Sequence, residues 1–207
     1  MRKNRGYKRG EPHRDARLFV IACEGAERER RYFEALAGEG SRRLKVRILS
    51  PEDDGGKGDS RQHSAPKWAL DRVVKYLDEN AINIVQGDRV WLILDHDRWG
   101  KKALHALAQE CDSRGWGLAL SNPCFEVWLI LHVADIQHTV ANSCQEFKRE
   151  IPDKFQGGYN VQVFTQKNYV DRAIERAIAC DKVKGVFCDP KTSKVYKVVQ
   201  ELIEILG

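Results

Sequence analysis

Residues 18–25 read LFVIACEG and residues 90–97 read VWLILDHD, and these two stretches determine the expected fold. Continuous apolar runs of this length are typical of strands buried on both faces of a parallel sheet. The carboxyl ends of such strands meet at one edge, where open α/β folds place their sites. Glu24, Asp95 and Asp97 should converge there and repel one another. A divalent cation with oxygen ligands relieves that repulsion, and Mg²⁺ is the leading candidate.

Strand and helix signals alternate through the first two-thirds of the chain, which predicts a parallel sheet with crossover helices. The expected strands are residues 18–23, 45–50, 89–94 and 117–120, and the expected helices of this part are residues 27–37, 66–79, 101–114 and 124–132. Ser121-Asn122-Pro123 is interpreted as the start of the last helix, with proline in its first turn. Residues 51–64 are rich in glycine and polar residues and are expected to form a loop.

The pattern changes after residue 134 to helices and loops without strands. The expected helices are residues 144–150, 167–180 and 193–206, with a turn at Gly157-Gly158. Lys191, Lys194 and Lys197 are interpreted as a solvated helix face, with nucleic-acid contact as the less favoured alternative. With 207 residues, one principal domain is expected. We divide the chain into a flexible basic arm (1–17), an α/β core (18–134) and a helical carboxyl-terminal part packed on that core (135–207).

Charge is concentrated at the amino terminus. Residues 1–17 carry seven basic and two acidic side chains, which accounts for the net charge of +5, and the remainder balances. Such an arm suits contact with a nucleic-acid backbone, and a solubilising tail is an equally weighted alternative. The basic residues assigned to nucleic-acid binding are Arg2, Lys3, Arg5, Lys8 and Arg9. No stretch approaches the length of a membrane span and no secretory signal is evident, so a cytoplasmic protein without a membrane partner is expected.

Further candidate residues accompany the acidic triad. Glu126 lies among large apolar residues near Asn122, and either touches the metal, orients its waters or caps the helix. Glu29 lies one turn beyond Glu24, where a solvated, salt-paired role is the commoner one. Asp95 and Asp97 could also serve only as a cap of the following helix. The six cysteines show no C-x-x-C spacing and are interpreted as reduced thiols, mostly filling the core.

Several motifs together resemble the RloB family over about residues 17–206. They are Cys23-Glu24-Gly25 followed by Glu29 and Tyr32-Phe33, Leu94-Asp95-x-Asp97, Ser121-Asn-Pro-Cys-Phe-Glu126 with Trp128 and Leu131-His132, and Asp189-Pro-x-Thr192. Members of that family accompany bacterial restriction-modification and abortive-infection loci, and their fold is related to the Toprim domain. The resemblance therefore implies a Toprim-like Rossmannoid α/β fold and a role in anti-phage defence.

The resemblance also implies an activity. Toprim domains place a glutamate after the first strand and Asp-x-Asp after the third, and Glu24, Asp95 and Asp97 match those positions. This implies a metal-dependent nuclease acting on DNA or RNA, with Mg²⁺, or Mn²⁺ in its place, at the aspartates and Glu24 as ligand or general acid/base. Asn122, Glu126 and Glu29 would support this centre.

Two other activities are compatible with the same residues. One is a non-catalytic subunit that binds nucleic acid or a protein partner in a defence complex, and the other is nucleotidyl transfer of the primase type. The implied partners are nucleic acid and an accompanying ATPase or restriction-modification subunit, and an oligomer is compatible with the sequence. The chain departs from the family pattern twice: Arg28 replaces a threonine before Glu29, and Arg98-Trp99 replaces a further acidic residue after Asp97.

Overall fold

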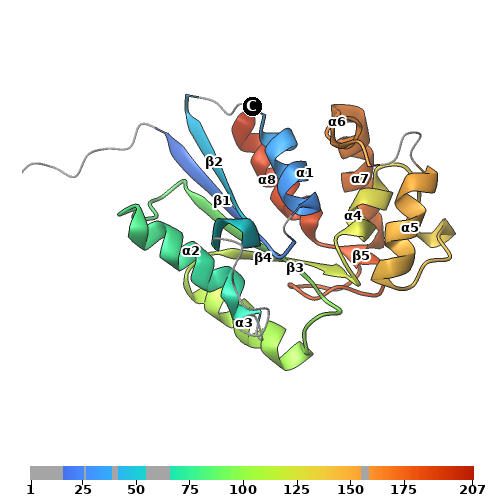
Figure 1. Ribbon diagram of the computed structural model, residues 1–207, viewed down its shortest axis with the longest axis horizontal. Coiled ribbons are helices and arrows are strands. Elements are labelled where there is room, and N and C mark those ends of the chain that lie inside the picture. Colours follow the sequence, from blue (N-terminus) through green and yellow to red (C-terminus); the bar gives the residue numbers. More distant parts are fainter. Residues whose placement is uncertain (1–15, 26, 39–41, 55–65, 155–158) are drawn as a thin grey trace, which may run out of the picture.

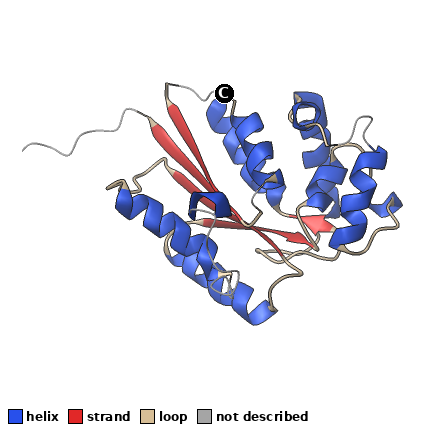
Figure 2. Cartoon of the chain, in the orientation of Figure 1, coloured by secondary structure: helices blue, strands red, loops and turns tan. Residues whose placement is uncertain are grey.

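The computed structural model describes residues 16–25, 27–38, 42–54, 66–154 and 159–207 as a mixed α/β fold with one five-stranded sheet (Figure 1; Figure 2). The strands are β1 (Arg17–Cys23), β2 (Leu44–Leu49), β3 (Arg89–Asp95), β4 (Gly117–Asn122) and β5 (Thr192–Ser193). Their order across the sheet is β2-β1-β3-β4-β5, and only β5 runs antiparallel to its neighbour. The arrangement is consistent with a Rossmann-like α/β fold and confirms the predicted class.

Eight α-helices lie in the described part of the chain, with short 3-10 helices at Pro51–Asp54 and Ile136–His138. The α-helices are α1 (Arg28–Ala37), α2 (Lys67–Glu79), α3 (Lys101–Ser113), α4 (Glu126–Leu131), α5 (Cys144–Lys154), α6 (Val161–Phe164), α7 (Lys167–Cys180) and α8 (Val195–Leu206). None of these helices combines the length and apolar character that crossing a membrane requires.

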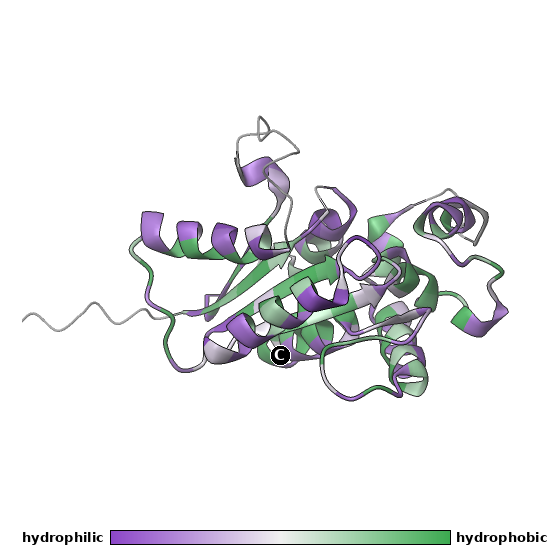
Figure 3. Ribbon diagram, turned by 90° about the horizontal axis from the view of Figure 1, so that it is seen from below, coloured by the Kyte–Doolittle hydropathy of each residue, from purple (hydrophilic) through white to green (hydrophobic). Residues whose placement is uncertain are grey.

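Helices cover both faces of the sheet because β1 is apolar on both sides. Phe19, Ile21 and Cys23 face a core built with α1, α4, α7 and α8. The alternate residues of β1, such as Val20, face a second core built with α2 and α3. This layering is visible in Figure 3, where apolar strands lie between helices whose outer surfaces are polar. The continuous apolar run therefore follows from burial on two faces.

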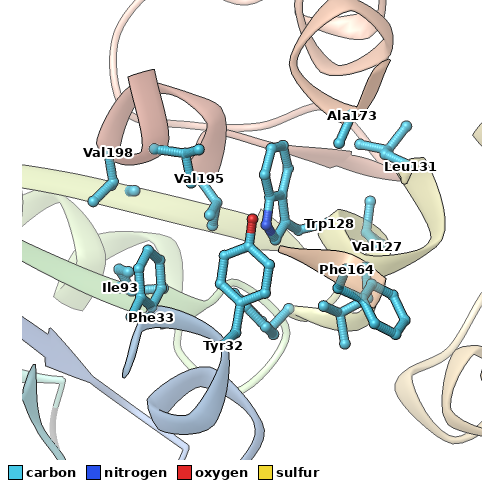
Figure 4. Packing of buried hydrophobic residues seen from close by; sticks show 14 of the residues in the cluster. Tyr32, Phe33, Ile93, Val127, Trp128, Leu131, Phe164, Ala173, Val195 and Val198 are labelled. Carbon is cyan, nitrogen blue, oxygen red and sulfur yellow. The ribbon is translucent and has the colours of Figure 1, made fainter. Parts of the chain in front are cut away.

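An aromatic cluster joins α1 to α4 on the first face of the sheet (Figure 4). The Tyr32 hydroxyl lies 3.2 Å from His132 Nε2, and His132 Nδ1 lies 2.9 Å from the Trp128 carbonyl. Trp128 and Phe164 meet the His132 ring edge-on. The imidazole is fully buried, and burial lowers its pKa to about 4, so it is neutral at neutral pH. This packing fixes how the start of α1 sits against α4.

The predicted strand and helix positions are largely confirmed, with corrections near β4. Strand β4 extends to Asn122 because Ser121 and Asn122 pair with Ser193 and Thr192 of β5. Helix α4 therefore begins at Glu126, after a cis bond before Pro123, so Ser121-Asn122-Pro123 is not a helix start. The two-residue β5 was not predicted, because so short an edge strand has no alternation to detect. Helix α6 was also missed.

Lys194 corrects another expectation, because it does not lie on a solvated helix face. Its side chain is 1% exposed, and Nζ lies 2.5 Å from both Asp181 Oδ1 and the Val183 carbonyl oxygen. Residues 1–15 of the basic arm, most of the expected loop at 51–64 and the Gly157-Gly158 turn lie outside the described residues. Arg17, which was assigned to the flexible arm, is instead the first residue of β1 and pairs with Leu44 of β2. The division at residue 134 stays a prediction.

Candidate metal centre

The carboxyl ends of β1, β3 and β4 bring the predicted acidic residues to one edge of the sheet. Asp95 is the last residue of β3 and pairs in register with Ser121 of β4. Glu24 follows β1 directly, and its N–H donates to the Ile93 carbonyl at 3.0 Å, which continues the parallel ladder. Strand pairing alone therefore places Glu24 and Asp95 on adjacent strand ends, as the sequence predicted.

The Glu24 carboxylate is held by the segment that follows β3. Its Oε2 accepts from the Asp95 N–H at 2.9 Å and from Trp99 Nε1 at 3.2 Å. Its Oε1 lies 3.0 Å from Arg98 Nη1. Burial raises the pKa of Glu24, and these hydrogen bonds and the Arg98 charge oppose that rise. Arg98 and Trp99 thus contact this carboxylate directly.

Asp95 lies among other carboxylates. Its Oδ1 accepts from the Phe125 N–H at 2.8 Å, which leaves Oδ2 for other ligands. Burial raises the pKa of Asp95 well above its usual range, and the negative charges of Glu29, Glu24 and Glu126 raise it further. A bound divalent cation would reverse these effects by pairing with the ionised carboxylate.

Glu29 lies close to the same centre on the first turn of α1. It is 8% exposed, and a Cβ built on Gly25 would lie 1.9 Å from Glu29 Oε2. Only glycine at residue 25 leaves room for this carboxylate. Burial raises the pKa of Glu29 to about 7, and the charges of Glu126 and Glu24 add to the rise. Glu29 is therefore a buried member of the acidic centre and not a solvated, salt-paired residue.

Glu126 begins α4 and is paired with cationic side chains. Its Oε1 accepts from Arg28 Nη1 at 2.6 Å and lies 3.9 Å from Lys148 Nζ. Arg28 thus neutralises part of the charge of the centre. Asn122 points its amide elsewhere, since Nδ2 donates to the Cys188 carbonyl at 3.1 Å.

Asp97 brings a cysteine into the centre. It is exposed, and its Oδ2 accepts from the Cys144 thiol at 3.2 Å. Among the described residues, two groups place three potential ligand atoms within 4.8 Å of one another. They are Asp95, Asp97 and Cys144, and Cys124, Glu126 and Cys144. Glu24 belongs to neither group. A metal can therefore be held here, with the aspartates as the predicted oxygen ligands.

Sequence reasoning missed the cysteines and cations of this centre. Cys124 is buried, as a core cysteine would be, but Cys144 is half-buried and contacts Asp97. Cys144 and Lys148 are four residues apart on α5 and so face the centre together. That i, i+4 spacing on an otherwise polar helix was the one available signal. Asp97 and Cys144 are 47 positions apart in the sequence, and that separation gave no signal of their contact.

Comparison with known proteins gives one result. Residues 19–202 match the protein family described as RloB-like protein. No curated protein and no solved structure matches the chain. The match spans both acidic strand ends, α4 and the helices that pack on it.

Proposed function

The chain belongs to the RloB-like family, and from that membership and its acidic centre we propose that it is a metal-dependent nuclease that hydrolyses phosphodiesters of DNA or RNA. One observation carries the proposal. The Asp95 carboxylate is surrounded by those of Glu29, Glu24 and Glu126, at the sheet edge where α/β folds bind ligands. Burial and these neighbouring charges raise the pKa of Asp95, and a divalent cation would favour its ionised form.

Each acidic residue has a distinct part in this proposal. Asp95 and Asp97 hold the cation, Mg²⁺ or Mn²⁺, which when bound polarises a phosphate oxygen and lowers the pKa of water. Glu24 takes up or returns a proton, and its raised pKa suits that task. Glu24 reaches a substrate only when the half-exposed Arg98 releases its Oε1 and turns toward a phosphate. Glu126 and Glu29 set the negative potential around the aspartates.

The biological setting follows from the family and is part of the proposal. We place the activity in the cytoplasm, in a bacterial anti-phage or restriction-linked system that includes an ATPase or a restriction-modification subunit. The proposed substrate is nucleic acid. A cleavage assay should therefore include duplex DNA, single-stranded DNA and structured RNA.

The test compares wild type with Asp95→Asn, which keeps the Oδ1 that accepts from the Phe125 N–H. Millimolar Mg²⁺ or Mn²⁺ should raise the melting temperature of wild type but not of this variant, because only the native site binds the cation. Cleavage of labelled nucleic acid with Mn²⁺ should be lost in Asp95→Asn and fall by about 10² to 10⁴-fold in Glu24→Gln. Asp112→Asn, an exposed aspartate on α3, is the matched control and should behave as wild type.

A second function is favoured by one observation: Glu24 and Glu126 are each paired with an arginine. Such pairing neutralises part of the negative charge that a metal would otherwise neutralise. It would suit a subunit that binds nucleic acid or a protein partner without cleaving nucleic acid. Equal nucleic-acid affinity of wild type and Asp95→Asn, together with no effect of either cation on melting and no cleavage, would support this role and contradict the nuclease.

A further inference from the structure

Two cysteines from different elements converge beside the aspartates. Cys124 precedes α4, and Cys144 is the first residue of α5. Their sulfurs and a carboxylate oxygen of Glu126 all lie within 4.8 Å of one another. The neighbouring Cys144 thiol, then burial, raises the pKa of the Cys124 thiol. Cys124 and Cys144 are 20 positions apart in the sequence, so their proximity results from the packing of α5 on α4.

The donor set of this group differs from that of the aspartates. Two sulfurs and one carboxylate oxygen are ligands of Zn²⁺ and not of Mg²⁺, which prefers oxygen alone. Tetrahedral zinc holds sulfur at about 2.3 Å and oxygen at about 2.0–2.2 Å, so its ligand atoms lie roughly 3.3–3.8 Å apart. The three atoms here lie within 4.8 Å of one another, so reaching that spacing requires a contraction of at most about 1.5 Å. Arg28 Nη1 donates to Glu126 Oε1 at 2.6 Å, which leaves Glu126 Oε2 as the oxygen for a metal.

We propose that Cys124, Cys144 and Glu126 form a second metal position that binds a thiophilic divalent cation, Zn²⁺ in the first instance, beside the oxygen site of Asp95 and Asp97. Three protein ligands leave a fourth coordination position open. The two positions communicate through Cys144, whose thiol donates to Asp97 Oδ2 at 3.2 Å. A metal-bound thiolate has no proton to donate, so zinc binding releases Asp97 from this hydrogen bond.

Neither aspartate is a ligand of the thiolate position, so metal binding there does not depend on the proposed nuclease activity. The readout must therefore be independent of cleavage. Co²⁺ serves as the probe, since cobalt bound by thiolate gives a near-ultraviolet charge-transfer band that cobalt bound only by oxygen lacks.

The experiment titrates Co²⁺ into the full-length, chelator-treated, reduced protein and then displaces it with Zn²⁺. Wild type should show the charge-transfer band, and Zn²⁺ should abolish it. Cys144→Ser should lose the band. Its affinity for Zn²⁺ should also fall by more than roughly 10 to 100-fold, which is the loss typical of replacing a residue that only hydrogen-bonds to a metal ligand. Cys180→Ser, which removes a half-buried thiol at the end of α7, should keep the band.

Two further variants separate the outcomes. Asp95→Asn should keep the cobalt band while losing Mg²⁺-dependent stabilisation, which assigns the two effects to different positions. Cys124→Ala, checked for folding by circular dichroism, should lose the band like Cys144→Ser. Absence of a charge-transfer band at saturating Co²⁺ in folded wild type, or a band that persists in Cys144→Ser, would overturn the thiolate position. Neither result depends on nuclease activity.

Discussion

At the scale of single residues, the Glu29 carboxyl makes stability depend on pH. Its pKa rises from 4.5 to about 7 in the folded protein. A carboxyl with a raised folded pKa contributes its full stability below pH 4.5 and loses it as pH rises through 7, a change of about 3 kcal/mol. Between pH 4.5 and 7, the free energy of unfolding of Glu29→Gln should therefore rise by about 3 kcal/mol relative to that of wild type. Urea denaturation in chelator across this range measures the difference.

The exposed Glu79→Gln on α2 is the control for that measurement and should track wild type at every pH. A Glu29→Gln profile parallel to that of wild type would show that the Glu29 carboxyl ionises normally. Saturating metal should reduce the difference between Glu29→Gln and wild type, because a nearby cation favours the ionised carboxylate.

Residues of the centre differ in how far the sequence could predict them. Glu24 and Asp95 were predictable, because each lies at the end of a continuous apolar strand and parallel strand ends share an edge. Glu29 was predicted as a supporting residue, although its burial depends on the absence of a side chain at Gly25. The contact of Cys144 with Asp97 was not predictable, because it arises from the packing of α5, and the i, i+4 spacing of Cys144 and Lys148 does not show which element they face.

At the scale of elements, the start of α8 depends on a buried ion pair. Lys194 Nζ lies 2.5 Å from Asp181 Oδ1, and Asp181 Oδ2 accepts from the Tyr196 hydroxyl at 2.8 Å. Removing one partner leaves a buried charge, so Asp181→Asn should lower the free energy of unfolding by about 3 to 5 kcal/mol. Lys182→Met, which removes an exposed lysine in the same loop, should change it little. Chemical denaturation gives both values.

The double variant Asp181→Asn with Lys194→Met tests the interpretation of that pair. It should be less destabilised than the sum of its single variants, since no charge is then left unpaired. Additive losses would mean that the two side chains contribute independently. The sequence placed α8 correctly from its apolar period, but it could not show that Lys194 is buried, because the pairing of β5 with β4 turns this lysine inward.

At the scale of the whole molecule, charge is divided between an acidic centre and a basic terminus. Residues 18–207 balance 28 basic against 28 acidic side chains, so the excess of +5 resides in residues 1–17. An acidic site repels a polyanion until its metal is bound. Binding of nucleic acid therefore needs a separate source of positive charge, and the arm is the one that the composition supplies.

Replacing Arg2, Lys3, Arg5, Lys8 and Arg9 together by glutamine tests whether the arm contacts phosphates. Each phosphate contact contributes about −0.9 to the slope of log affinity against log salt, so five lost contacts would reduce the magnitude of the slope by up to about 4.5. Affinity at low salt should fall, while the melting temperature stays that of wild type. Fluorescence anisotropy with labelled duplex at a series of salt concentrations measures the slope. An unchanged slope with reduced solubility would instead identify the arm as a solubilising tail, and the backbone contacts would then have to come from the folded part, where Arg98 beside the acidic centre is the first residue to replace.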